Sequence, residues 1–289
     1  MRASTVQSAH FQTIPLSRID LKDDTFRITT RTDIGDLLGS IQYDGLIRPP
    51  LLIKRRSAFI IVSGFRRIAA CLKLEWKDIT ARVLIANVAA LDCLRLAIAE
   101  NSLQRSLNLI ETSRCLRKLS LYIADTRDLA ESASSLGLPD NPSIIDKIKG
   151  LSLLPWPIQS SILTDTISLT MAKELESMEA DVAIAFVQLF EQLKIGLNKQ
   201  REILTMVKEI GRRESLSSQA VMAEKRFIEI MTHQDLDRGQ KSRQLRAYLR
   251  RRRYPRIAEA EKKFEFHHKN LNLGNDIKLI PPKEFEANL

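Results

Sequence analysis

The sequence predicts an α+β domain in residues 1–110, an all-helical domain in residues 111–214 and a charged helical segment in residues 215–289. Three observations support this division. Short strand patterns alternate with helical patterns only in the first part, whereas helical periodicity broken by turn signals fills the second. The third part contains nine basic residues and no acidic one between positions 238 and 256. Outside that stretch there are 36 basic and 35 acidic residues, so one short segment supplies nearly all of the net charge of +10.

The elements of the first domain follow from local patterns. Residues 11–20 contain a short extended stretch, and the pair Pro49-Pro50 forces an extended chain before the next strand. Runs rich in β-branched residues predict strands over 51–53, 58–62 and 79–85. Apolar residues at helical spacing predict helices over 33–43, 66–74 and 89–105.

Composition excludes several classes of protein. No apolar run approaches the roughly 20 residues of a membrane helix, and the first ten residues lack the apolar stretch of a signal peptide. Three widely spaced cysteines, Cys71, Cys93 and Cys115, indicate reduced buried thiols in a cytoplasmic protein. Neither zinc-ligand spacing nor a Walker A or nucleophile-elbow motif occurs, so we expect no conventional metabolic enzyme.

Residues 59–70, FIIVSGFRRIAA, predict a strand that turns at Ser63-Gly64 into a helix carrying Arg66 and Arg67. Free amides at a helix start attract phosphate, glycine permits close approach, and arginine can grip two phosphate oxygens. The turn is therefore a candidate phosphate site. An ordinary strand-turn-helix with two solvated arginines is the alternative.

Residues 99–111, AENSLQRSLNLIE, group polar side chains at a helix end. Oxygens of Glu100 and Asn101 suit a Mg²⁺ ion that bridges phosphates, and Arg105 lies about one turn away. The alternative is a polar helix end with no ligand. In either case we expect Asn108 and Glu111 to form a capping box at the start of the next helix.

Residues 127–155 fit a helix-turn-helix. The first helix ends at Gly137, and the second begins at Asn141 as N-cap with Pro142 in the first turn. Three isoleucines, Ile144, Ile145 and Ile148, are expected to pack inward. The polar side chains expected to face the DNA major groove include Ser143, Lys147 and Lys149. A generic helical hairpin is the alternative.

The basic stretch contains the run Arg250, Arg251, Arg252 and Arg253. Crowded positive charge without acidic neighbours favours a polyanionic partner, and double-stranded DNA fits best. We expect sequence-independent phosphate contacts here. A solvated helix face is one alternative, and an anionic membrane surface is disfavoured by the thin apolar face of this helix.

Taken in order, these features resemble the ParB family of DNA-partition proteins (ParB, RepB and KorB). The segments SIQYDGLIRPPLLIKR, VSGFRRIAA, AENSLQRSLNLIE and LSLLPWPIQSSILTDTISLTMAKEL are similar to successive family motifs. The resemblance covers about residues 12–180 and identifies residues 1–110 as a ParB-like nucleotide-binding domain and residues 111–214 as the helix-turn-helix domain.

The resemblance also implies ligands and partners. Gly64, Arg66 and Arg67 would bind the triphosphate of CTP, Glu100 and Asn101 would hold Mg²⁺, and Arg105 would contact the nucleotide or a partner subunit. A homodimer would bind a DNA palindrome and close as a CTP-gated clamp, with slow CTP hydrolysis at most and no catalytic residue assigned. A partition ATPase would be a further partner, and the protein would be cytoplasmic, on a nucleoid or plasmid.

Three departures from the family motifs accompany the resemblance. Phe65 stands where an acidic residue is usual, Arg48 replaces a glutamine, and the pair Gln104-Arg105 lies one place late. They favour an alternative, a plasmid or mobile-element transcriptional regulator of the same fold without nucleotide switching. A nuclease or phosphotransferase on this fold is a third reading, but Cys71 occupies an apolar helix position and is expected in the core.

Overall fold

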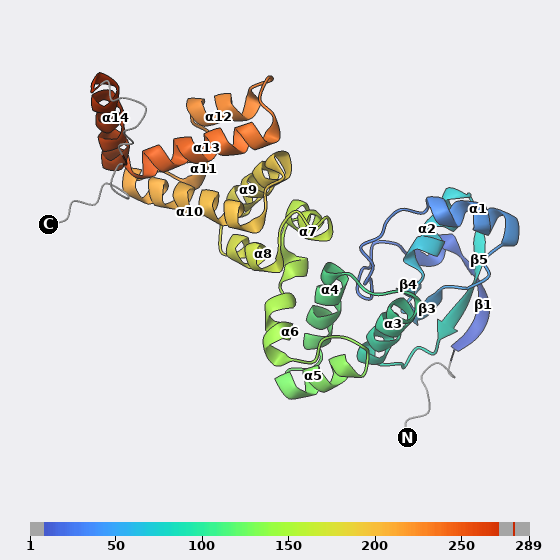
Figure 1. Cartoon of the computed structure of the whole chain (residues 1–289). Coiled ribbons are helices and arrows are strands. Elements are labelled where there is room, and N and C mark those ends of the chain that lie inside the picture. The colour runs from blue at the N-terminus through green and yellow to red at the C-terminus, as the bar shows by residue number, and fades with distance from the viewer. Residues whose placement is uncertain (1–8, 272–279, 281–289) are drawn as a thin grey trace. The chain divides into compact units, whose positions relative to one another are not determined.

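The computed structural model describes residues 9–271 and residue 280 (Figure 1). Its contacts divide the chain into two compact units, Met1–Leu154 and Pro155–Leu289, whereas the sequence predicted boundaries at residues 110 and 214. Helices that follow residue 110 therefore pack within the first unit. The expectation for the first ten residues rests mostly on positions outside the described residues, as does the end of the 215–289 segment.

A five-stranded mixed sheet forms the centre of the first unit, in the order β1-β5-β3-β4-β2. Its strands are β1 (Ala9–Pro15), β2 (Ile19–Asp20), β3 (Leu51–Arg55), β4 (Ala58–Ser63) and β5 (Asp78–Leu84), and the short helix η2 (Leu16–Arg18) separates the first two. The pairs β1–β5 and β3–β4 are antiparallel, whereas β3–β5 and β2–β4 are parallel. The three predicted strands are confirmed, and the expected extended stretch is two strands joined by one turn.

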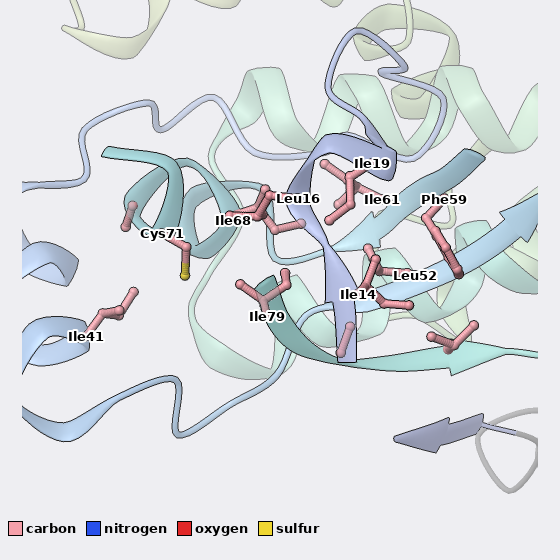
Figure 2. Close-up of a cluster of buried hydrophobic side chains, with 13 residues drawn as sticks. Ile14, Leu16, Ile19, Ile41, Leu52, Phe59, Ile61, Ile68, Cys71 and Ile79 are labelled. Carbon is pink, nitrogen blue, oxygen red and sulfur yellow. The ribbon is translucent and has the colours of Figure 1, made fainter. Parts of the chain in front are cut away.

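The helices of the first unit are α1 (Gly35–Asp44), α2 (Phe65–Lys73), α3 (Ala90–Gln104), α4 (Leu109–Ser120), α5 (Thr126–Ser134) and α6 (Pro142–Ile148), followed by the short helix η3 (Leu151–Leu153). Ile68 and Cys71 lie three residues apart on α2 and belong, with Leu52 and Ile61 of the sheet, to one buried hydrophobic cluster (Figure 2). Because strand side chains alternate, Ile60 points to the other sheet face. All three cysteines are buried and free, as expected.

Helices α5 and α6 occupy the predicted helix-turn-helix segment. Gly137 has φ +71° in the turn, and the Asn141 side chain accepts hydrogen bonds from the amides of Ser143 at 3.0 Å and Ile144 at 3.2 Å. The predicted N-cap is thus confirmed. The expectation for Ile144 is wrong: its side chain is 43% exposed, because α6 turns Ile145 and Ile148 inward.

The second unit is all-helical. It contains α7 (Trp156–Leu163), α8 (Leu169–Glu176), α9 (Ala180–Leu193), α10 (Leu197–Glu214), α11 (Ser218–Met222), α12 (Lys225–Thr232), α13 (Arg238–Arg253) and α14 (Pro255–Asn270). Leu245 and Leu249 lie four residues apart on α13, are fully buried, and face the core that α13 shares with α9, α10 and α12. Across residues 9–271 no helix is long and apolar enough to cross a membrane.

Candidate functional site

A cavity of about 350 Å³ opens in the first unit beside the start of α2 and the end of α3. Its lining includes all six residues predicted to bind nucleotide: Gly64, Arg66, Arg67, Glu100, Asn101 and Arg105. Arg31 and Arg48 add two more guanidinium groups, while Glu100 is the one acidic residue among the described residues that line it. A cavity with five arginines and one carboxylate favours a polyanionic ligand.

Gly64 makes the close turn at this cavity possible. It has φ +100° and forms the N-cap of α2, where no side chain accepts the first amides of the helix. A Cβ atom at this position would lie 2.7 Å from Cβ of Pro50, so any side chain would collide with the preceding segment. The amides at the start of α2 are therefore open to an anion, and the helix dipole favours negative charge there.

The two arginines of α2 hold different parts of the cavity wall. Arg66 donates from Nε to the carbonyl of Asp33 at 2.7 Å and pairs with the carboxylate of Asp36. The hydrogen bond from Arg66 lowers the pKa of Asp36. Arg67 donates to the carbonyl of Arg48 at 2.5 Å and to Glu100 at 2.9 Å. Both guanidinium groups are thus oriented at the cavity before any ligand arrives.

Glu100 and Asn101 lie side by side near the end of α3. The Glu100 oxygen Oε1 accepts from Arg67, and the Asn101 amide nitrogen donates to the carbonyl of Ala97 at 2.8 Å, which turns its oxygen away from that bond. Among the described residues no group of three or more His, Cys, Asp or Glu side chains could hold a metal ion. Two oxygen donors at a cavity lined by five arginines fit Mg²⁺, which takes few protein ligands and completes its shell with phosphate and water.

Arg105 lines the cavity but is held by Glu111. Its two terminal nitrogens donate to the two Glu111 oxygens at 2.6 Å each. Glu111 is fully buried and also accepts from the amides of Thr30 at 2.9 Å and Asn108 at 3.1 Å. Burial alone would raise the pKa of Glu111, but these donors outweigh it and lower the pKa to about 2. The same pair raises the pKa of Arg105.

The capping box of Asn108 and Glu111 is confirmed, because the Glu111 amide donates to the Asn108 side chain at 2.9 Å. Sequence reasoning nevertheless missed the other contacts of Glu111, whose carboxylate accepts hydrogen bonds from Arg105 and from Thr29 and Thr30 of a distant loop. It also missed Asp36 as the partner of Arg66. Thr30 lies 81 residues from Glu111, and Asp36 lies 30 residues from Arg66, so no local pattern marked these contacts.

The polar residues expected to face DNA lie on or beside α6. Ser143 and Lys147 are exposed, whereas Lys149 is half-buried and pairs with Asp146 at 2.6 Å. Ser143 and Lys147 therefore belong to one open surface of the first unit, while Lys149 has a carboxylate neighbour on its own helix turn.

The four arginines at the end of α13 differ in exposure and in ion pairing. Arg250 and Arg251 are exposed, but Arg252 pairs with Glu214 and with Glu224, the latter at 2.6 Å. Arg253 pairs with Glu209. The expectation of uncompensated charge is therefore wrong for Arg252 and Arg253, because α10 and the residue before α12 supply carboxylates that the local sequence does not contain.

Comparison with known proteins agrees with the α+β fold of the first unit. Residues 1–102 match the family model of the ParB N-terminal domain. A probable chromosome-partitioning protein ParB of Campylobacter jejuni is 28% identical over 64% of this chain and 64% of its own length. A nucleoid occlusion protein of Bacillus cytotoxicus is 26% identical over 72% of this chain and 71% of its own length. The chain thus spans less than two thirds of the Campylobacter protein.

Among solved structures, a truncated ParB of Caulobacter crescentus complexed with CTP-γ-S is similar with a TM-score of 0.29 and 22% identity, over 63% of this chain and 98% of that one. Residues 1–102 therefore carry the ParB N-terminal domain, and the mixed α+β fold of this part of the chain is followed by many helices.

Proposed function

We propose that the chain is a DNA-binding partition protein whose first unit binds CTP with Mg²⁺. The observation that carries the proposal is the cavity at the start of α2, where Gly64, Arg66, Arg67, Glu100 and Asn101 converge. Their convergence from two helices far apart in the sequence supports one site for a polyanion with a bound cation.

Each side chain has a distinct task in this proposal. The α2 amides beside Gly64 and the guanidinium groups of Arg66 and Arg67 bind the phosphates. Glu100 and Asn101 would hold Mg²⁺, which neutralises phosphate charge when bound. Arg105 reaches the same cavity from its pair with Glu111. CTP hydrolysis is at most slow, and no residue is assigned to it.

DNA binding is proposed for two surfaces, each in its own unit. In the first, α5 and α6 act as the helix-turn-helix, and Ser143, Lys147 and Lys149 reach the major groove. In the second, the exposed Arg250 and Arg251 make phosphate contacts independent of sequence. We further propose that the protein is a cytoplasmic homodimer that binds a palindromic DNA site. The dimer closes on DNA as a CTP-gated clamp, and a partition ATPase moves the complex.

The deciding experiment is calorimetric titration with each of the four ribonucleoside triphosphates and Mg²⁺, with and without duplex DNA. We expect selective CTP binding that Arg66→Ala and Asn101→Ala each weaken at least about tenfold, since each removes a charged or metal-type contact. Arg127→Ala, which alters an exposed arginine of α5 outside the cavity, is the matched control.

Two other outcomes of this titration would contradict the proposal. Intact DNA binding with no nucleotide binding would indicate a transcriptional regulator of the same fold without a nucleotide switch. Loss of binding in Arg127→Ala as well would mean that the effect of the other variants is not specific to the cavity.

A further inference from the structure

Helix α6 exposes one large hydrophobic side chain. The structure describes every residue of this helix, and Ile144 is 43% exposed, whereas Ile145 and Ile148 are 1% and 5% exposed. The two buried isoleucines pack into the first unit, so the core does not use Ile144. A single exposed isoleucine is common on protein surfaces and needs no explanation by itself. Its place on the helix decides what it can contact.

Ile144 lies in the first turn of α6, and the backbone around it is held in place. The Asn141 side chain accepts hydrogen bonds from the amides of Ser143 at 3.0 Å and of Ile144 at 3.2 Å. In the turn before α6, the hydroxyl of Ser134 donates to the carboxylate of Asp140 at 2.9 Å. The first residues of a recognition helix are the ones that contact base edges in a helix-turn-helix. Ile144 is therefore at the end of α6 where bases would be read.

The two exposed polar side chains proposed to contact DNA are neighbours of Ile144. Ser143 directly precedes it, and Lys147 follows three residues later, which brings the two side chains together on the helix surface. Residues at this spacing have Cβ atoms about 5–6 Å apart, and stacked base pairs repeat about every 3.4 Å. Ile144 and Lys147 can therefore reach neighbouring base pairs of one groove.

Long-range attraction to phosphate contributes little at this helix. Residues 139–150 contain two acidic residues, Asp140 and Asp146, and two basic residues, Lys147 and Lys149, so their net charge is zero. Lys149 also pairs with Asp146 at 2.6 Å. Sequence-independent binding strengthens with the number of cations that meet phosphates. DNA binding by α6 therefore depends on short-range contacts with base edges.

An isoleucine side chain can read one feature of the major groove. It has no hydrogen-bond donor or acceptor, so it gains nothing from the polar groups of the bases. Thymine presents a C5 methyl group in the groove, and apolar side chains contact this methyl group, whereas cytosine has only a hydrogen atom there. A serine such as Ser143 can bond to more than one base. The aliphatic contact is thus more selective than its polar neighbour.

We infer that Ile144 is a specificity-determining residue that contacts the methyl group of a thymine in the DNA site. The inference rests on the proposed DNA binding by α6, and it names a base that the site must contain. The thymine should lie beside the base pair that Lys147 contacts. Loss of one buried methyl group corresponds to about fourfold weaker binding.

Replacement of thymine by deoxyuridine tests this contact, because deoxyuridine pairs with adenine in the same way and lacks only the methyl group. Binding sites are first selected from a random duplex library with the full-length chain. Each thymine of the selected site is then replaced singly by deoxyuridine, and fluorescence anisotropy measures the affinity. We expect the wild type to bind about fourfold more weakly when one particular thymine of a half-site is replaced.

Three variants identify the side chain that makes the contact. Ile144→Ala should bind the thymine and deoxyuridine duplexes equally, with about the affinity of the wild type for the deoxyuridine duplex. Ile144→Val keeps a branched aliphatic side chain and should retain most of the difference. Ile228→Ala is the matched control, because it removes an isoleucine of α12 that is 46% exposed, and it should keep the full difference. Urea unfolding checks that each variant is folded.

The outcomes separate this inference from the proposed function. If a sequence is selected and no thymine position responds to deoxyuridine, the methyl contact is wrong and DNA binding stands. A difference that persists in Ile144→Ala, or that also disappears in Ile228→Ala, would likewise overturn the role of Ile144. Binding to all duplexes with no selected sequence would overturn base reading by α6, and absence of any DNA binding would overturn the proposed function itself.

Discussion

Arg105 and Glu111 form a two-pronged ion pair in which each terminal nitrogen of the guanidinium lies 2.6 Å from its own carboxylate oxygen. Glu111 is fully buried, whereas Arg105 lies partly open at the edge of the cavity. Removing one partner of such a pair leaves an uncompensated charge, which typically costs about 3–5 kcal/mol. The same ion pair therefore stabilises the first unit and fixes the position of Arg105 at the proposed nucleotide site.

Stability of the first unit should depend on pH through Glu111. Its pKa lies at about 2 in the fold against 4.5 for the ordinary carboxyl, so its contribution is present above pH 4.5 and is lost as the pH falls toward 2. The difference corresponds to roughly 3 kcal/mol. Urea unfolding between pH 6 and pH 3 should show the first part of this loss, about 2 kcal/mol, in the wild type and much less of it in Glu111→Gln. Glu131→Gln, at an exposed position of α5, should keep the wild-type slope.

Two glycine substitutions should have opposite effects. Gly64→Ala places a Cβ atom 2.7 Å from Pro50 in a backbone with φ +100°, so it should lower the free energy of unfolding by about 1–3 kcal/mol. Gly39→Ala, in α1 with no atom within 4 Å of the new Cβ, should raise it by about 0.5–1 kcal/mol. Urea denaturation measures both. Equal effects at the two positions would contradict the strained turn.

The arginines at the end of α13 should separate into two classes. The double change Arg250→Gln and Arg251→Gln should lower the salt slope of DNA binding by about 2, because two phosphate contacts are lost, and leave the melting temperature unchanged. Arg252→Gln should instead cost about 1–2 kcal/mol of stability, since Glu214 and Glu224 lose their partner. A salt titration on two unrelated duplexes, paired with thermal unfolding, distinguishes the classes. Sequence-dependent loss in the double variant would show that these side chains read bases.

The N-cap of α6 should control the order of that helix. Asn141→Ala removes the acceptor for two amides and should cost about 1 kcal/mol, whereas Asn141→Ser should retain most of the stability. If α6 faces DNA as proposed, the alanine variant should also bind duplex more weakly than the serine variant. Fluorescence anisotropy with labelled duplex measures this difference, and equal behaviour of the two variants would argue against it.

Local patterns predicted the elements well. The β-branched runs became β3, β4 and β5, and the apolar stripe in residues 33–43 became α1, because burial of these side chains matches the periods of strand and helix. The residues of the two polar motifs also line one cavity, as a common site requires. Roles for the helix-turn-helix and for the individual binding residues stay predictions.

Charge compensation was not predictable in the same way. Arg66 meets Asp36 across 30 residues, and Arg252 meets Glu214 across 38. Counting charged residues along the chain compares only neighbours in sequence, whereas an ion pair depends on the distance between two charged groups in the folded molecule. The same holds for Glu111. Its capping box with Asn108 could be predicted from the local sequence, but its hydrogen bond from the Thr30 amide depends on the packing of a loop 81 residues away.

The three buried thiols have a practical consequence for labelling. Burial raises the pKa of Cys71, raises the pKa of Cys93 to about 11 and raises that of Cys115 further. Maleimide dyes react with the thiolate, so the native cysteines should not react with them at neutral pH while the protein is folded. A single reporter at Leu103→Cys, where the present side chain is 86% exposed at the end of α3, could then be attached without first removing any native cysteine.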